Sequence, residues 1–216
     1  MSKKLTQAEL IETFETVLQN ATHDEIAPLL ETWGYDETAH TADLELLAQV
    51  RAAHAAQQRE SAQADVAHKA EASAESAVRA GFTILHRFIR FAARRNPDLN
   101  IISTLDVQPV PQPEQAFLNY ADGLLARIAD QPAIAAALAE LRQDEEKLDE
   151  LRGLLDAMRQ ANAAQAKEQG EAERATAAYT ALLRQVRAAY DYIKLISKEA
   201  LKDDPQLIEI MGLGKV

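Results

Sequence analysis

The 216-residue sequence has no cysteine, which excludes disulfide bonds and thiol catalysis. Aromatic residues make up only 5% of the chain, and glycine and proline occur seven times each. Strands favour aromatic and β-branched residues, and turns favour glycine and proline. Alanine, leucine, glutamate, glutamine, arginine and lysine, which favour helices, are instead abundant. The composition therefore predicts an all-α protein.

Positive charge is in the minority, and long apolar runs are missing. The 34 acidic residues outnumber the 23 lysines and arginines, which gives a net charge of −11. This balance opposes general binding to DNA, RNA or anionic lipid. No stretch approaches the roughly 18 apolar residues of a membrane span, and amphipathic sequence follows the first four residues in place of a secretion signal. We expect a soluble cytoplasmic protein without a nucleic-acid partner.

Two short helices are expected before the first long one. Thr6 and Glu9 have the spacing of a capping box and predict a helix over about 7–20. Thr22-His-Asp-Glu25 has the same spacing and predicts a short helix that continues to about Thr32. Gly34 suits the residue that follows the end of this helix.

Two long helices are predicted, over about 37–95 and 145–203. Asp36 and Asp144 can cap their first turns, and no proline interrupts either stretch. Each stretch ends directly before a proline-containing pair, Asn96-Pro97 in the first and Asp204-Pro205 in the second.

An alternative topology folds each long stretch back on itself. Turns near Gln57–Ala64 and Gln165–Ala172 would give a conventional bundle of shorter helices. Neither segment contains proline or a cluster of turn residues. The sequence therefore favours two continuous helices.

The second half of the sequence resembles the first. We divide the chain into a first repeat over 1–105, a proline-rich connector over 106–113 and a second repeat over 114–216. Matching residues include Leu10/Leu118, Ile26/Ile134, Leu30/Leu138, Asp36/Asp144, Arg51/Arg159, Arg79/Arg187 and Leu99/Leu207. The repeats predict one pseudo-two-fold structure, in which the long helices are antiparallel and short helices pack at each end, as in a bundle or coiled coil.

Large and small side chains are distributed unevenly along the predicted long helices. Bulky apolar residues concentrate towards both ends, whereas alanine and polar residues fill the middle. Buried alanine contributes little apolar area, so most of the stabilisation should come from two packed ends.

The end of the first long helix combines aromatic and basic residues. Phe88 and Phe91 alternate there with Arg87, Arg90 and Arg94. Such a segment could contact an acidic partner, RNA or a membrane surface. The same arginines would also be favoured by the helix macrodipole alone, because they lie near a C-terminus.

Three other residues are candidates for interaction. Trp33 precedes Gly34 at a helix junction, where it could fill a bundle end or anchor a partner. Glu60 and Glu168 occupy matching positions in the two repeats. Two such carboxylates could bind a cation or share a proton, although polar residues also set the register of coiled coils.

Histidines do not form a convincing metal site. His40, His54, His68 and His86 fall roughly along one side of the first long helix. Adjacent members would be about 20 Å or more apart along the axis, too far to share an ion. No nucleotide-binding, protease or hydrolase motif occurs. We therefore expect no metal, cofactor or catalytic residue.

The leading functional hypothesis is a non-enzymatic helical interaction or scaffold protein with a protein partner, and a homodimer is compatible with it. One alternative is a bundle that binds a small apolar ligand or a metal ion between its helices. Another is peripheral membrane association through the basic and aromatic end of the first long helix.

Overall fold

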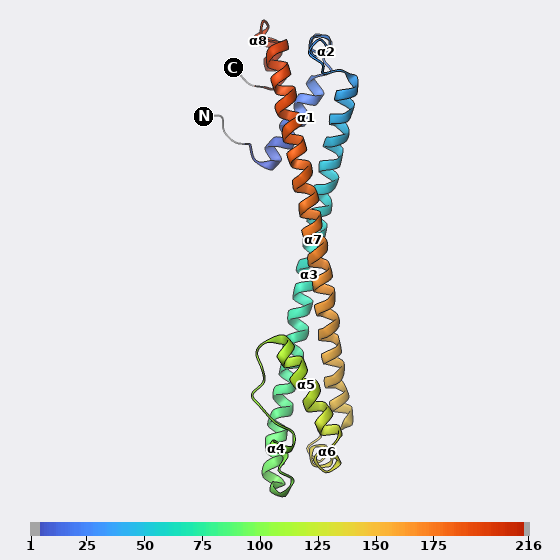
Figure 1. Cartoon of the computed structure of the whole chain (residues 1–216), viewed down its shortest axis with the longest axis vertical. Helices are drawn as coiled ribbons and strands as arrows, with labels where there is room; N and C mark the ends of the chain where they lie inside the picture. Colours follow the sequence, from blue (N-terminus) through green and yellow to red (C-terminus); the bar gives the residue numbers. More distant parts are fainter. Residues whose placement is uncertain (1–4, 214–216) are drawn as a thin grey trace. The chain divides into compact units, whose positions relative to one another are not determined.

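The computed structural model describes residues 5–213, which contain helices and connecting segments but no β-strand. The chain forms two compact units. Unit 1 combines residues 1–62 with 169–216, and unit 2 comprises residues 63–168. Each unit contains the start of one long helix and the end of the other (Figure 1). The compact units therefore do not coincide with the two halves of the sequence.

Eight α-helices and one 3-10 helix are present in the described part of the chain. Their order is α1 (Gln7–Asn20), α2 (Ala27–Glu31), α3 (Glu37–Arg95), η1 (Pro97–Leu99), α4 (Ile101–Thr104), α5 (Glu114–Ala129), α6 (Pro132–Ala139), α7 (Glu145–Ala200) and α8 (Pro205–Ile210). The all-α prediction is confirmed, and the two long helices pack together with the short ones.

Both long helices are continuous. α3 has 59 residues and α7 has 56. The alternative with turns near Gln57–Ala64 and Gln165–Ala172 is therefore wrong, because both segments are helical throughout. α7 ends three residues before the predicted Asp203, and the chain passes through a turn before Asp204 caps α8.

Only one of the two predicted capping boxes forms. Thr6 Oγ1 accepts a hydrogen bond from the Glu9 backbone N–H, and the Glu9 carboxylate accepts one from the Thr6 N–H. The Thr22–Glu25 prediction was wrong. Thr22 Oγ1 donates to the backbone oxygen of Gln19, and residues 21–26 form turns before α2 begins at Ala27. Because the Thr22 hydroxyl is bonded to the end of α1, it does not cap α2.

The turns that lead into the long helices are alike. In each, a backbone N–H reaches five residues back, from Tyr35 to Leu30 and from Gln143 to Leu138. The residue before it has positive φ, +85° at Gly34 and +59° at Arg142. Asp36 and Asp144 then cap α3 and α7 by accepting backbone N–H bonds of 2.9 and 3.2 Å.

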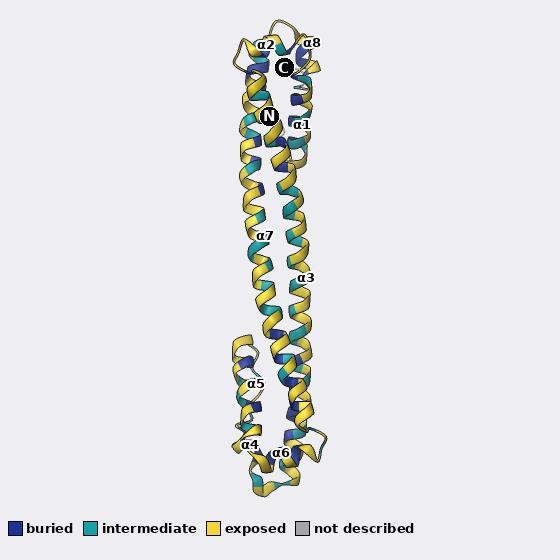
Figure 2. Ribbon diagram, turned by 90° about the vertical axis from the view of Figure 1, so that its right-hand side faces the viewer, coloured by how far each residue is buried: buried dark blue, intermediate teal, exposed yellow. Residues whose placement is uncertain are grey.

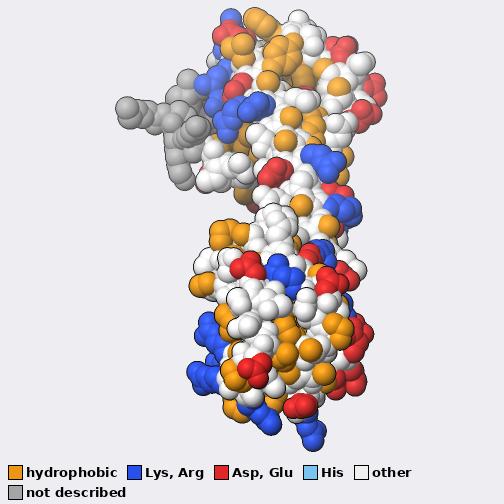
Figure 3. All heavy atoms as spheres, turned by 60° about the horizontal axis from the view of Figure 1, so that its bottom comes forward, with side chains coloured by type: hydrophobic (Ala, Val, Ile, Leu, Met, Phe, Trp, Pro, Cys, Tyr) orange, Lys and Arg blue, Asp and Glu red, His pale blue; other side chains and the backbone are white. Residues whose placement is uncertain are grey.

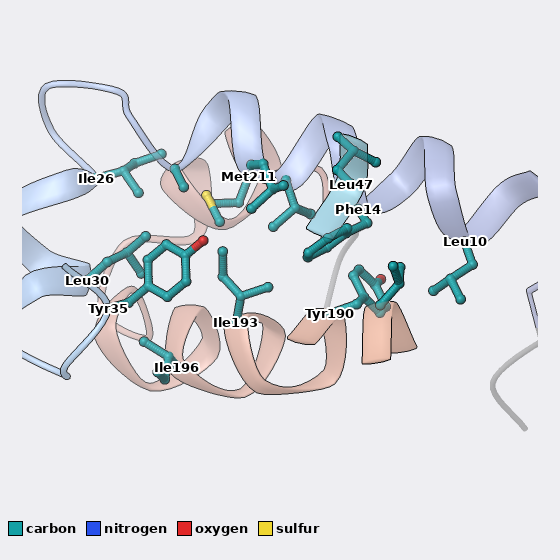
Figure 4. Packing of buried hydrophobic residues seen from close by; sticks show 14 of the residues in the cluster. Leu10, Phe14, Ile26, Leu30, Tyr35, Leu47, Tyr190, Ile193, Ile196 and Met211 are labelled. Carbon is teal, nitrogen blue, oxygen red and sulfur yellow. The ribbon is translucent and has the colours of Figure 1, made fainter. Parts of the chain in front are cut away.

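Unit 1 has its own hydrophobic core (Figure 4). Figure 4 shows α1, α7 and the segment that includes α8 directing side chains towards one another, together with Tyr35 from the turn before α3. The labelled side chains are Leu10, Phe14, Ile26, Leu30, Tyr35, Leu47, Tyr190, Ile193, Ile196 and Met211. Within this unit the first part of α3 lies antiparallel to the last part of α7 (Figures 1 and 2).

Unit 2 has a second core, formed by the end of α3, the start of α7 and helices α4–α6. Phe82 and Phe117 meet edge to face, with ring centroids 5.6 Å apart. Arg79 attaches the proline-rich connector to this core. Its guanidinium donates 2.7 Å bonds to the backbone oxygens of Pro111 and Gln112 and lies 4.4 Å from the Phe117 ring centroid.

Burial in the long helices follows the distribution of large side chains. Along α3, full burial stops at Val50 and resumes at Val78 (Figure 2). The alanines at positions 53, 56, 64 and 67 are only half-buried. Each unit is therefore stabilised mainly through its bulky residues, as the distribution of large and small side chains predicts.

Candidate interaction surface

The end of α3 has one buried face and one exposed face. Phe82, Leu85 and Ile89 lie in the core of unit 2. Ile84 and Phe91 are each 48% exposed, and Phe88 is half-buried. Ile84, Phe88 and Phe91 are four and then three residues apart, which places them on one side of the helix.

These residues surround a shallow surface pocket. Ile84, Arg87, Phe88 and Phe91 line it, and all four belong to α3. We call these four residues, together with Arg95 one turn further on, the α3 surface. Single exposed apolar residues are common on proteins, but several in one stripe mark an interaction site more specifically.

The nearby cations have no acidic partner of their own. Arg87, Arg90, Arg94 and Arg95 are all exposed, and none forms an ion pair with a residue between 5 and 213. The last turn of α3 contains Arg94 and Arg95, where the macrodipole favours positive charge. The dipole explains why cations are tolerated there, but it does not explain the exposed aromatic residues among them.

The sequence predicts five contact residues near the end of α3, and they do not all lie on one face of the helix: Arg87, Phe88, Arg90, Phe91 and Arg94. Arg87, Phe88 and Phe91 lie together at the pocket. Arg90 lies on a different side, close enough to His86 for its charge to help lower the pKa of that imidazole. Arg94 lies at the edge of the stripe. Sequence reasoning missed Ile84, because exposure could not be read from its type.

His86 and Tyr120 form a partly buried polar pair beneath Arg90. The histidine Nε2 lies 2.8 Å from the tyrosine hydroxyl, which also lies 3.2 Å from the Gln108 backbone oxygen. Burial lowers the pKa of His86, and the Arg90 charge lowers it further. This pair attaches the start of the connector to α3, so we assign it a structural role.

Unit 1 exposes apolar residues at the matching part of α7. Tyr192 is 51% exposed and Leu195 is 61% exposed. They are three residues apart on one side of α7, and the half-buried Lys198 follows one turn later. Sequence analysis did not single out Tyr192 and Leu195. They hold the positions that match Ile84 and Arg87 in the first repeat, so the exposure of Ile84 in the structure draws attention to them.

Trp33 is half exposed, at 50%, in the turn between α2 and α3. It does not fill the core of unit 1, where the neighbouring Tyr35 is buried instead. Its exposed indole therefore remains a candidate contact of unit 1.

The two predicted carboxylates belong to different units. Glu60 is in the part of α3 that belongs to unit 1, where its Oε1 lies 3.4 Å from Arg59 Nε. Glu168 is in the part of α7 that belongs to unit 2, and its Oε1 lies 3.5 Å from Lys167 Nζ. Each carboxylate is half-buried and has a neighbouring cation in its own helix.

Each of the four α3 histidines has its own contacts. His40 Nε2 lies 3.0 Å from the Leu18 backbone oxygen, and His54 Nε2 lies 3.0 Å from Gln58 Nε2. His68 Nδ1 lies 3.4 Å from a Glu71 oxygen. His40 thus contacts α1 and His86 contacts Tyr120 of α5, whereas His54 and His68 contact residues of α3, and none of these contacts joins two of the histidines.

Two hollows of unit 1 bear on the small-ligand alternative. One lies beside Tyr35 and His40 between α2 and α3. The other is lined by the N-terminal turn of α1 together with Arg51, His54 and Tyr179. The His54 ring lies 4.9 Å from the Tyr179 ring, and its buried Nδ1 has no hydrogen-bond partner among the residues described. Such an atom is commonly satisfied by an ordered water molecule.

Comparisons with known proteins do not assign this surface. The chain matches no protein-family model, no curated protein and no solved structure. No helix in the described residues is long and apolar enough to cross a membrane. In Figure 3 acidic side chains gather along one edge of unit 2, and basic and acidic side chains are mixed over the rest of the face that is shown.

Proposed function

We propose that this chain is a non-enzymatic interaction protein whose α3 surface binds a partner protein. The observation that carries the proposal is the exposed stripe of Ile84, Phe88 and Phe91 on a helix whose opposite face is buried. Exposed aromatic side chains combined with arginine are typical of residues that dominate binding energy at protein interfaces.

Exposed apolar residues in each of the two units support a bridging role. The exposed pair of Tyr192 and Leu195 in unit 1 provides a second apolar contact. The similar turns at Gly34 and Arg142 support an internal duplication, in which each copy supplies one exposed patch. A scaffold that holds two partners, or two copies of one partner, needs two such surfaces.

A capture experiment with two matched variants tests the proposal. Phe91→Glu places a carboxylate in the α3 surface, whereas Ala163→Glu adds the same charge at an exposed position of α7 in the same unit. Cells of the native host would express each variant with an affinity tag, and mass spectrometry would quantify the proteins retained. We expect at least one protein retained by the wild type and by Ala163→Glu to be lost with Phe91→Glu. Identical sets for all three would refute the proposed function.

A further inference from the structure

We infer that the partner presents an acidic amphipathic helix to the α3 surface. This inference rests on the proposed function and adds the chemistry of the ligand. Ile84, Phe88 and Phe91 span two turns of one helix face, and a shallow pocket lies among them. A partner helix meets such a face with apolar residues at positions i, i+3 or i+4, and i+7.

The charges around the stripe select an acidic partner. Arg87 lines the pocket itself, Arg95 continues the same face, and Arg94 lies at its edge. These exposed guanidinium groups have no carboxylate partner in the described chain. Glutamate or aspartate flanking the apolar residues of a partner helix would pair with them, whereas lysine or arginine would be repelled.

A lipid surface fits the same residues less well. An anionic membrane would attract the arginines by about 1 kcal/mol each, but it would also repel a chain whose net charge is −11. Few apolar side chains are available to enter the lipid. A peptide helix contacts only the neighbourhood of the arginines, so within the screening length of about 10 Å it meets fewer of the chain's carboxylates than an extended membrane surface does.

A second copy of this chain is also a poor match. The most acidic helical turns of unit 2 begin α7, but three of their carboxylates are already paired within that helix. Arg152 binds Glu145 and Asp149, and Lys147 binds Glu150. Binding the arginines of another copy would require these ion pairs to be given up.

Selection from a display library tests the inference without knowledge of the partner. The library would contain helical peptides of about 15 residues with random surface residues, near the length at which isolated helices become stable. It would be selected against the full wild-type chain and counter-selected against Phe91→Glu. We expect the surviving peptides to have apolar residues at helical spacing and a clear excess of glutamate and aspartate. Their affinity should fall roughly tenfold with Arg87→Glu/Arg95→Glu, the loss expected for two exposed ion pairs.

Lys69→Glu/Arg184→Glu is the matched control, because it reverses two exposed charges elsewhere and gives the same net charge. It should leave peptide affinity unchanged. Circular dichroism must show that all variants melt like the wild type, and Phe91→Ser replaces Phe91→Glu if the latter unfolds.

The possible failures are distinguishable. Neutral or basic peptides that need Phe91 would refute the acidic preference and leave the proposed function standing. No Phe91-dependent peptide, together with unchanged capture from cells, would refute both. Arginine-dependent flotation with phosphatidylserine vesicles would overturn the inference in favour of a membrane ligand. Concentration-dependent dimerisation that requires the same arginines would overturn it in favour of self-association.

Discussion

Replacing Arg79 with methionine should destabilise unit 2 by about 2–3 kcal/mol. The substitution retains an unbranched apolar side chain and removes the guanidinium. That group donates bonds to the backbone oxygens of Pro111 and Gln112, binds Glu75 at 2.7 Å and lies over the Phe117 ring. No other described side chain attaches this part of the connector through as many polar contacts.

The magnitude follows from the separate contacts. A hydrogen bond from a charged donor contributes about 1.5–3 kcal/mol when buried, but both carbonyls lie on a partly exposed connector and can bind water instead. We therefore assign about 0.5–1 kcal/mol to each. The ion pair with Glu75 contributes about 0.3–0.5 kcal/mol, as is usual for exposed pairs four residues apart. The contact with Phe117 adds about 0.5–1 kcal/mol.

Urea denaturation followed by circular dichroism measures the effect, and hydrogen exchange locates it. Arg79→Met should lower the midpoint and increase exchange at the start of α5. The denaturation midpoint of Arg79→Lys should lie between those of the wild type and Arg79→Met, because an ammonium group lacks the planar geometry with which a guanidinium reaches both carbonyls. Arg184→Met, at an exposed position, should change stability by less than about 0.5 kcal/mol. If Arg79→Met behaves like Arg184→Met, the assigned role of Arg79 is wrong.

Three further predictions concern local structure. Gly153→Ala should stabilise the chain by about 0.5–1 kcal/mol in thermal denaturation, because a β-carbon at this position meets nothing within 4 Å. At Gly81 the added β-carbon would lie 2.5 Å from Leu151 Cδ2, so the stabilisation by Gly81→Ala should be smaller or reversed. Asp204→Ala should lower the free energy of unfolding measured with urea by about 1 kcal/mol, because the carboxylate accepts hydrogen bonds from the backbone N–H groups of Gln206 and Leu207. Asn96→Ala should lower it by less, because the Asn96 side chain makes no such capping bond. Burial lowers the pKa of His86 below its ordinary value of 6.5, so its contribution to stability is present above about pH 6.5 and is lost as the pH falls towards the lowered pKa. The stability difference between wild type and His86→Gln should change over this range when urea denaturation is repeated at several pH values.

Helix positions were predictable because their signals are local. Thr6 and Glu9 define the start of α1, and the absence of proline between Asp36 and Asn96 allows one long helix. The error at Thr22 has a local cause as well. The hydroxyl of Thr22 binds the last turn of α1, a competing use of the same side chain that spacing alone cannot reveal.

The register of the short helices depended on packing and was harder to predict. When the buried faces of α1 and α5 are compared, Leu10 corresponds to Phe117 and Val17 corresponds to Leu124. This correspondence is one residue away from the predicted match of Leu10 with Leu118. The ion pairs of Arg51 with Glu15 and Arg159 with Asp122 follow this shifted register. Identity along the chain could not show which side of a short helix faces the core.

The exposed stripe was only partly predictable for a related reason. Apolar residues surround α3 between Phe82 and Phe91, so no single amphipathic face can be read from the sequence. Packing against α5 and α7 selects the side with Phe82 and Leu85 and leaves Ile84 and Phe91 exposed. The basic and aromatic composition indicated the region, but only the structure separates core residues from contact residues.

Site-specific photo-crosslinking in living host cells tests the central claim most directly. A photoreactive phenylalanine analogue would replace Phe91 in one variant and Ala163 in another, both at exposed positions of unit 2. If the α3 surface binds a protein, illumination will join a discrete partner to position 91 and not to position 163. The same crosslinked products at both positions, or none at position 91, would contradict the account.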